Sequence, residues 1–200
     1  MQTALDWIAH SGVVQGVIIG AALSYLTAVL IMNIVIRSIT TTVNGWSIIT
    51  RCGRPENGVF LRAACAKALP MVNVVEESAY WTATKDAAGR RLDGRHDYVL
   101  RFPAGQLPPN DAFWSLSVTD TTGYMTTTAH ERSSIDDRGA LVTNADGAVD
   151  VHFHQHAPTA GEENWLAVPP GRFKLMLRAY LPGAAVLDGT YQVPAIVKAD

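Results

Sequence analysis

Three histidines at alternate positions are the densest concentration of reactive side chains in this sequence. His152, His154 and His156 lie in the stretch VDVHFHQHAP. In a β-strand, alternation sends these imidazoles to one face while Val151 and Phe153 point to the other. Same-face neighbours are about 7 Å apart, so two imidazoles can share an ion at about 2.1 Å, whereas a third needs strand curvature or another chain. The strand therefore either holds a transition metal or presents its histidines to solvent above a buried apolar face.

A metal on this strand would need ligands from elsewhere in the chain. The available residues are His96, His130, Asp97, Glu131 and Asp150. Motifs that specify a chemistry are missing from the sequence, including a nucleophile elbow, a phosphate-binding loop, a dinucleotide fingerprint, a Cys-x-x-Cys pair and a His-Glu-x-x-His helix. We therefore predict no catalytic residue and expect no cofactor, with the histidine-bound metal as the alternative.

A long apolar run precedes the histidine strand. No Asp, Glu, Lys or Arg occurs between Asp6 and Arg37. The 24 residues from Val13 to Ile36 exceed the length needed to cross a hydrocarbon core of about 30 Å at about 1.5 Å per residue. We predict a transmembrane helix over residues 13–37, after an N-terminal interfacial segment over residues 1–12. A cleavable signal peptide is the alternative, although the start lacks a basic region and the run exceeds the usual apolar core of about 7 to 15 residues.

Small residues recur at every fourth position of this predicted helix. Side chains four apart lie on one side of a helix, so such a row forms a shallow groove that lets another helix approach closely. We predict that the row packs against a helix of another membrane protein or of a second copy of the chain. The alternative is that small residues are simply common in membrane helices. The row comprises Gly12, Gly16, Gly20, Ser24 and Ala28.

Charge and cysteines give incomplete information about the compartment. The formal net charge of -2 provides no basic surface for nucleic acid, so nucleic acid is not an expected partner. Arg37, Arg51 and Arg54 follow the apolar run, and a basic bias favours the cytoplasmic side for the residues after it. Cys52 and Cys65 fit either a disulfide outside the cytoplasm or buried thiols inside it.

The rest of the chain divides into a linker and a β-rich domain. Residues 38–72 read as a juxtamembrane linker containing a short amphipathic helix from Val59 to Leu69, which ends before Pro70. Over residues 73–200, short segments rich in aromatic and β-branched residues alternate with turn-forming clusters. This spacing predicts a mainly β fold, an antiparallel β-sandwich or jelly roll. Asp146-Gly147 predicts a hairpin turn between ALVTN and AVDVHFH.

Several blocks in this region resemble a known family. RFPAGQLPPNDAFWSLSVTD, NADGAVDVHFHQ, ENWLAVPPGRFKLMLRAYLP and VLDGTYQVP are similar to successive blocks of the domain-of-unknown-function 1214 family, over about residues 73–197. The resemblance implies a jelly-roll-like β-sandwich. It also implies the short subgroup with one N-terminal membrane anchor, in which the β domain is exported. The family carries no established reaction, and the implied export disagrees with the arginine bias.

Residues in the family-like blocks have structural interpretations. Phe113 and Trp114 alternate along a strand, so we expect one of them to pack in the core. We expect Asn164 to bond nearby backbone and Trp165 to cover the end of the sheet. A role in ligand binding is the alternative for both pairs.

A charged set closes the family-like blocks. Arg178 and Tyr180 share one strand face. With Asp188 they could form a polar cluster at the mouth of the sandwich. We expect an ion pair between Arg178 and Asp188 that ties the last two strands together.

Two classes of function fit these expectations. The first is a single-pass protein of the inner (cytoplasmic) membrane whose β-sandwich is a non-enzymatic accessory or structural subunit of a membrane protein assembly. We expect this β-sandwich outside the cytoplasm, with the cytoplasmic side as the alternative. The second is a ligand-binding or metal-dependent jelly-roll enzyme acting at the cell envelope. We favour the first because the helix carries a docking pattern and the sandwich lacks a recognisable set of catalytic groups.

Overall fold

The structure, a computed structural model, describes residues 11–69, 73–126, 134–156 and 164–199. The chain divides into two compact units. The helical unit comprises Met1–Ile39 and Glu56–Met71, and the β unit comprises Thr40–Pro55 and Val72–Asp200. The predicted architecture is confirmed at this level, because the chain is mainly β with an N-terminal apolar helix and a second, short helix.

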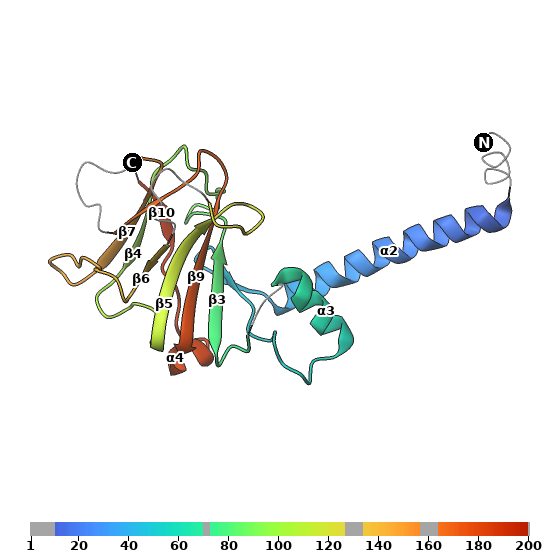
Figure 1. Ribbon diagram of the computed structural model, residues 1–200, viewed down its shortest axis with the longest axis horizontal. Coiled ribbons are helices and arrows are strands. Elements are labelled where there is room, and N and C mark those ends of the chain that lie inside the picture. Colours follow the sequence, from blue (N-terminus) through green and yellow to red (C-terminus); the bar gives the residue numbers. More distant parts are fainter. Residues whose placement is uncertain (1–10, 70–72, 127–133, 157–163, 200) are drawn as a thin grey trace. The chain divides into compact units, whose positions relative to one another are not determined.

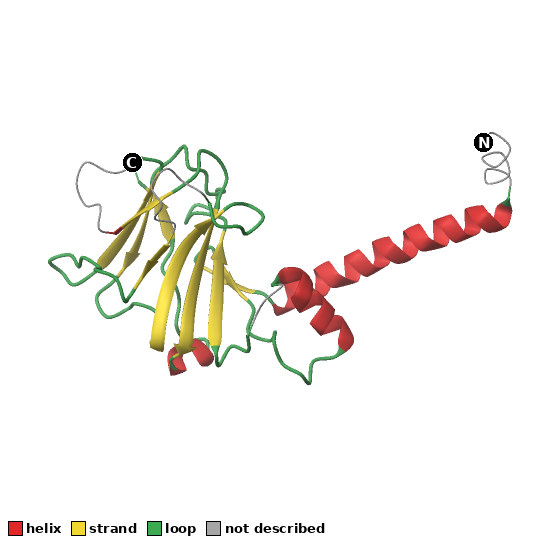
Figure 2. Ribbon diagram, in the orientation of Figure 1, coloured by secondary structure: helices red, strands yellow, loops and turns green. Residues whose placement is uncertain are grey.

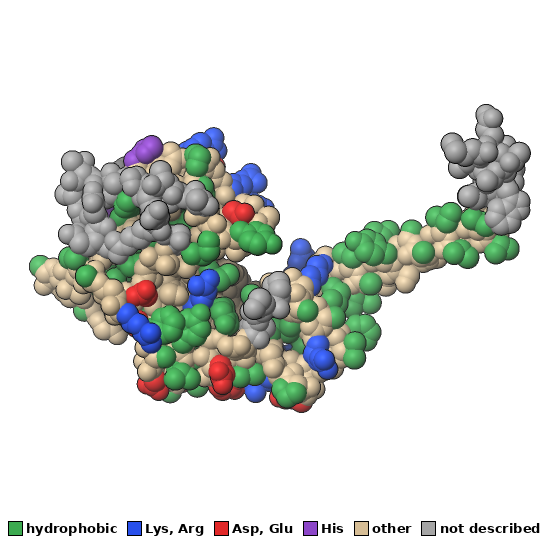
Figure 3. Space-filling view, viewed as in Figure 1, with side chains coloured by type: hydrophobic (Ala, Val, Ile, Leu, Met, Phe, Trp, Pro, Cys, Tyr) green, Lys and Arg blue, Asp and Glu red, His purple; other side chains and the backbone are tan. Residues whose placement is uncertain are grey.

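The helical unit contains α2 (Gly12–Ile39) and α3 (Val59–Ala68). Within the described residues, α2 alone is long and apolar enough to cross a membrane, and apolar side chains cover it along its length (Figure 3). The short helix α3 begins after Gly58 and ends at Ala68. Its end is explained by Pro70, because a residue that precedes proline is pushed out of the helical region. Lys67 Nζ donates to Asn33 Oδ1 at 2.9 Å, which joins α3 to the last turns of α2.

The larger of two sheets has six strands in the order β1-β2-β3-β9-β5-β6, all neighbouring pairs antiparallel (Figure 1). Its centre is the long pair β5 and β9, and both of its edges are three-residue strands. The strands are β1 (Thr41–Val43), β2 (Trp46–Ile48), β3 (Ser78–Ala83), β5 (Asn110–Thr119), β6 (Ser134–Asp136) and β9 (Lys174–Pro182).

The smaller sheet has four strands in the order β10-β4-β7-β8. Its β7–β8 pair is parallel, so this sheet is mixed rather than wholly antiparallel as the sequence led us to expect. Both of its edges are again three-residue strands. The strands are β4 (Tyr98–Phe102), β7 (Val149–His154), β8 (Trp165–Ala167) and β10 (Ile196–Lys198), and a short helix α4 (Ala184–Leu187) follows β9.

The two sheets share one core, which lies between the layers seen in Figure 2. Burial alternates along β7, where Val151 and Phe153 are fully buried, as their spacing predicts. Trp114 of β5 is also buried and lies across the core from Phe102 of β4, with ring centres 5.9 Å apart. The expected sandwich arrangement therefore follows from inward-facing aromatic and aliphatic residues of both sheets. The more specific prediction of a jelly roll stays a prediction.

The segment expected to be a linker also contributes to the larger sheet. Strands β1 and β2 form a hairpin around Asn44 and Gly45, which have φ values of 53° and 83°. Two positive φ angles match a type I′ turn, for which Asn-Gly is the preferred sequence. The Asn44 side chain donates to Val193 O at 3.0 Å, and the Trp46 indole donates to Pro194 O at 2.8 Å. Buried Trp46 thus fastens the hairpin to the C-terminal segment of the β unit.

The turn predicted at Asp146-Gly147 is present, but the hairpin around it is not. Gly147 has a φ of 77°, and Asn144 donates through its backbone N–H to Ala148 O at 2.8 Å. Residues 140–144 before the turn form no strand. Strand β6, which precedes them, pairs with β5 of the other sheet. The turn therefore connects a loop to β7 instead of joining two strands of one hairpin.

Candidate functional site

The row of small residues in α2 is exposed along its whole length. Gly12, Gly16, Gly20, Ser24 and Ala28 are all exposed, and a Cβ built on any of the three glycines meets no atom within 4 Å. Successive positions four apart are displaced by about 40° around the helix at 3.6 residues per turn. The row therefore winds around α2, and a straight partner helix could follow only part of it, in a right-handed crossing.

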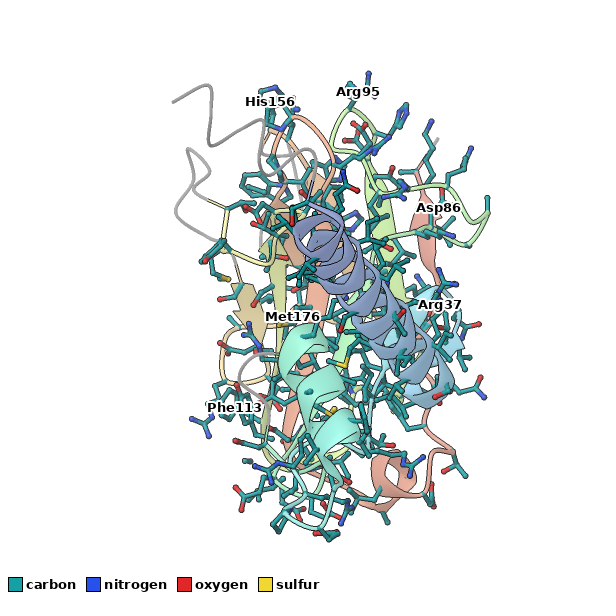
Figure 4. The ribbon with its side chains drawn as sticks, turned by 90° about the vertical axis from the view of Figure 1, so that its right-hand side faces the viewer. Arg37, Asp86, Arg95, Phe113, His156 and Met176 are labelled. Atoms are coloured by element: carbon teal, nitrogen blue, oxygen red, sulfur yellow. The ribbon has the colours of Figure 1, made fainter. Side chains whose placement is uncertain are left out.

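The histidine row is better defined. His152 and His154 lie on the outer face of β7, opposite to buried Val151 and Phe153, and both are partly buried. Their ring centres are 5.8 Å apart. The strand ends at His154, so His156 lies beyond it and is exposed. In Figure 4, His156 is seen at one end of the β unit. The structure thus brings two of the three predicted histidines together and leaves the third in solvent.

His154 has a carboxylate partner on the neighbouring strand. Tyr98 pairs with Phe153 in the β4–β7 register, which sets Asp97 opposite His154. Asp97 Oδ1 lies 3.2 Å from His154 Nδ1. This is an ion-pair contact when the imidazole is protonated. A neutral His154 with its proton on Nδ1, toward this carboxylate, has its lone pair on Nε2. His154 Nε2 is buried and has no hydrogen-bond partner within the described residues.

His152 lies in an environment that favours its neutral form. Burial lowers the pKa of His152 below its ordinary value, the charge of His154 lowers it further, and Asp150 acts in the opposite direction. The adjacent Asp150 Oδ2 accepts hydrogen bonds from Arg101 Nη1 at 2.8 Å and Asn144 Nδ2 at 2.9 Å. Arg101 also pairs with Asp146. These contacts direct Asp150 toward the Arg101 side of the sheet and away from His154.

The other proposed metal ligands do not complete this set. His96 belongs to the turn after Asp93, where its backbone N–H donates to Asp93 O at 3.0 Å. His130 and Glu131 lie outside the described residues. Across the described ranges, no group of three or more His, Cys, Asp or Glu side chains could hold a metal ion. A three-histidine site is therefore not formed by these residues.

On the other sheet, Phe113 and Trp114 divide as expected. Trp114 is buried, whereas Phe113 lies on the outer face and stacks on Tyr180 with ring centres 4.4 Å apart. The guanidinium carbon of Arg138 lies 4.2 Å from the Phe113 ring centre. A stacked pair covered by a guanidinium is a self-contained cation–π contact, which accounts for an aromatic side chain on the outer face.

The expected ion pair between Arg178 and Asp188 is not formed. Arg178 Nη1 donates instead to Ser117 Oγ at 3.4 Å. Asp188 Oδ1 accepts from the hydroxyl and the backbone N–H of Thr190, at 2.6 and 2.9 Å. These bonds hold the pKa of Asp188 below its ordinary value. Asp188 therefore stabilises the turn after α4. Its short carboxylate side chain accepts from donors within that turn and does not reach across to β9.

Asn164 bonds backbone, as expected, but that of a distant segment. Its amide nitrogen donates to Val142 O at 2.6 Å, and its amide oxygen accepts from Val142 N at 3.0 Å. The indole of Trp165 donates to His154 O at 3.2 Å. Asn164 is only 7% exposed, so its buried amide is satisfied by this two-way bond to the backbone of the more exposed Val142.

An aromatic cleft in the β unit was not predicted from the sequence. A cavity of about 220 Å³ is lined by residues of β1, β2, β3 and the segment after β9. Trp46, Trp81 and Tyr191 form its aromatic wall, and the Trp81 and Tyr191 rings meet edge to face with centres 5.9 Å apart. These three residues come from widely separated parts of the chain, so no local sequence motif predicts the cleft.

Comparisons with known proteins agree with the resemblance found in the sequence. The family model described as "Protein of unknown function (DUF1214)" matches residues 77–184. The chain belongs to this family. The DUF1214 match runs from the residue before β3 to the start of α4, so it includes β7 with its histidines and leaves out the β1–β2 hairpin and β10.

Two solved structures are similar to the chain. The VPA0106 protein from Vibrio parahaemolyticus is 27% identical with a TM-score of 0.62, and the match covers 72% of this chain and 36% of that protein. An uncharacterised protein from Burkholderia cenocepacia is 18% identical with a TM-score of 0.42, covering 90% of this chain and 51% of the other. The chain thus spans about a third to a half of the length of these proteins. No curated protein matches it.

Proposed function

We propose that this DUF1214 protein is a single-pass membrane protein whose β unit is an extracytoplasmic, non-enzymatic accessory module of a membrane protein assembly. The observation that carries the proposal is the exposed apolar surface of α2. At about 1.5 Å per residue, the 28 residues of α2 exceed a hydrocarbon core of about 30 Å. The inner membrane is the expected location.

The energetic argument for an anchor rests on what α2 would expose to water. At about 1.5 kcal/mol for each large apolar side chain, leaving ten of them in water would cost about 15 kcal/mol. That is as large as the whole net stability of an ordinary domain, about 5 to 15 kcal/mol. Lipid or a partner must therefore cover the helix. The ten exposed side chains are Val13, Val17, Ile18, Ile19, Leu23, Tyr25, Leu26, Leu30, Ile31 and Ile34.

The cysteines support an extracytoplasmic β unit. Cys52 and Cys65 are both disulfide-bonded, and the chain has no free cysteine. Disulfides persist in oxidising compartments and are rare in the cytosol. Three arginines after the apolar run favour the opposite side, but a folded domain that follows a first helix often overrides so weak a bias. We give the cysteine pair more weight because two cysteines placed to bond are more specific than three dispersed arginines.

The mature N-terminus provides the first test. We expect the intact mass of the protein isolated from membranes to include residues 12–39 and the protein to resist extraction by alkaline carbonate. A mass that lacks these residues would instead identify the apolar run as a cleaved signal sequence and remove the anchor from the proposal. The intact mass before and after reduction also reports the disulfide, because reduction adds two electrons and two protons, a gain of two hydrogen atoms.

Sidedness requires a separate measurement. Protease added to intact spheroplasts should digest the β unit and leave a membrane-protected α2 fragment. Protection of the β unit until the membrane is broken would place it in the cytoplasm and overturn the extracytoplasmic arrangement.

The accessory role requires a partner, and the small-residue row is its proposed contact. Gly20→Leu should release the protein from a complex isolated in mild detergent, because a large side chain prevents close helix approach. Ala22→Leu is the matched control, since position 22 faces almost the opposite side of the helix and receives the same leucine side chain. Recovery of the wild-type protein as a lone monomer, or equal loss in both variants, would contradict the proposed contact.

A further inference from the structure

One ring nitrogen of the β unit has the surroundings of a metal ligand without serving any bond in the fold. His154 Nε2 is buried and unpartnered within the described residues, while the other nitrogen of the same ring contacts Asp97. A buried polar atom left without a partner destabilises the folded state. A histidine that binds a metal through one nitrogen commonly donates the other N–H to a carboxylate, which fixes the tautomer and the ring orientation.

A second imidazole lies within reach of the same ion. An ion about 2.1 Å from a ring nitrogen lies about 3.2 Å from the centre of that ring, so two rings that share it are at most about 6.4 Å apart. The His152 and His154 ring centres are 5.8 Å apart, with the ring planes inclined by 37°. The pair is therefore close enough for chelation with small side-chain adjustments, as their adjacent same-face positions on β7 allow.

We propose that His152 and His154 together bind one transition-metal ion of the Zn²⁺ or Cu²⁺ type, with Asp97 as a positioning residue for His154. Imidazole is a preferred ligand of both ions, and Cu²⁺ is bound more tightly than Zn²⁺ by a given set of nitrogen ligands. Within the described residues no third side chain completes the set, so the remaining coordination positions would be filled from outside these residues. Such an ion can accept water or an anionic ligand at these positions.

An ion held in this way differs from a structural metal. Both ligands belong to one strand and are two residues apart, so binding closes almost no loop and constrains the unfolded chain little. We therefore expect the ion to raise the melting temperature of the β unit only slightly. The site is independent of membrane anchoring, because all of its residues belong to the β unit.

The test uses the full-length chain, purified in detergent with a tag that contains no histidine and stripped with a chelator. Zn²⁺ titrated by calorimetry should bind at one ion per chain. His152→Gln and His154→Gln should each abolish this binding. Asp97→Asn should weaken it by about 10- to 100-fold, the usual effect of removing an outer carboxylate partner. His156→Gln is the matched control and should leave the affinity unchanged, because His156 is exposed beyond the end of β7.

Cu²⁺ provides a readout that does not depend on any variant folding. The electron paramagnetic resonance spectrum of the wild-type protein at one equivalent of Cu²⁺ should show coupling to two imidazole nitrogens. Circular dichroism and the melting temperature of each variant check that it is folded, and Asp97→Asn should melt within a few degrees of wild type, because Asp97 is 54% exposed.

Several results would overturn the site. These are no Zn²⁺ binding at equimolar ratio, a Cu²⁺ spectrum with one nitrogen or none, and equal weakening by His156→Gln and His152→Gln. The last result would indicate loose chelation by exposed histidines. Loss of the anchor, seen in the intact mass, would leave the predictions for this site unchanged.

Discussion

Glycine has opposite roles in the two units of this protein. In α2, a Cβ added to Gly12, Gly16 or Gly20 meets open space. In the β unit, a Cβ added to Gly94 would lie 2.0 Å from Pro169 O, a distance that no side chain can tolerate. Each helical glycine leaves room for something outside the chain, whereas Gly94 makes room for the chain itself. A row of small residues in the sequence therefore does not by itself identify a packing contact. The structure has to show an atom lying against the glycine, as it does at Gly94.

The largest effect should come from filling the space at Gly94. Gly94→Ala forces the Pro169 backbone to move. This movement should weaken the backbone hydrogen bond from Gly94 N to Gly171 O, which is 2.8 Å long. We expect a loss of about 3 kcal/mol or more in the free energy of unfolding of the β unit, at the upper end of overpacking effects. Denaturant unfolding followed by near-UV circular dichroism measures it. Gly171→Ala, whose Cβ meets nothing within 4 Å, should change stability little, and equal losses in both variants would erase the contrast.

A smaller loss should follow when a buried amide is removed. Asn164→Ala leaves the backbone N–H and C=O of Val142 without their partners. We expect a cost of about 1 kcal/mol, because an ordinary hydrogen bond contributes about 0.5 to 1.5 kcal/mol and water can replace part of these bonds at Val142, which is 47% exposed. Asn144→Ala removes only an exposed bond to Asp150 and should cost less than about 0.5 kcal/mol. A similar cost at both positions would show that the Val142 contact is solvated.

Lowering the pH should destabilise the β unit through protonation of Asp93. Side-chain and backbone hydrogen bonds from Arg95 lower the pKa of Asp93 to about 2. A lowered folded-state pKa adds stability above the unfolded value of about 3.9, and that stability is lost as pH falls toward 2. Asp93→Asn should therefore flatten the fall in melting temperature between about pH 4 and pH 2. Asp93 belongs to the β unit, so this change reports the acid response of that unit.

Arg95→Gln provides the control for this pair. It should flatten the same acid limb, since it removes the donor that lowers the pKa of Asp93. An unchanged limb in either variant would mean that other carboxylates govern the acid response. The effect should be small, because the Arg95 side chain is 75% exposed and solvent weakens exposed ion pairs.

The smallest effect on folding should come from the helical glycines. Gly20→Ala adds a Cβ that touches nothing in the chain, so the unfolding free energy of the β unit should change by less than about 0.5 kcal/mol. Any substantial loss, measured by the same denaturant titration, would mean that α2 supports the β unit and would break the comparison.

Much of the fold could be predicted because it depends on short periods in the sequence. The alternation of Val151 and Phe153 with the histidines fixes which face of β7 is buried, and the uncharged run predicts the long helix. The Asn44-Gly45 pair also carried a hairpin signal, but its surrounding Thr-rich polar segment was interpreted as linker. For this hairpin, the turn preference of the Asn-Gly pair predicts the structure better than the composition of the surrounding segment does.

The candidate site could be predicted only in part, because its second half depends on strand register. The sequence named Asp97 among five possible ligands, yet only the pairing of Tyr98 with Phe153 brings Asp97 to His154. The same limit explains the incorrect ion pair of Arg178 and Asp188, since Thr190 offers Asp188 closer donors. Side-chain contacts between strands depend on the strand register, and the register cannot be predicted from any one segment of the sequence alone.

The short outer strands of both sheets restrict how this protein can assemble. Each described sheet ends on both sides in a strand of three residues, namely β1, β6, β8 and β10. A strand so short offers few free backbone groups to an incoming chain, which protects against aggregation by edge-to-edge pairing. It also makes recruitment of a partner by sheet extension unattractive. The side chains and the cleft of the β unit therefore offer a binding molecule more than these edge strands do.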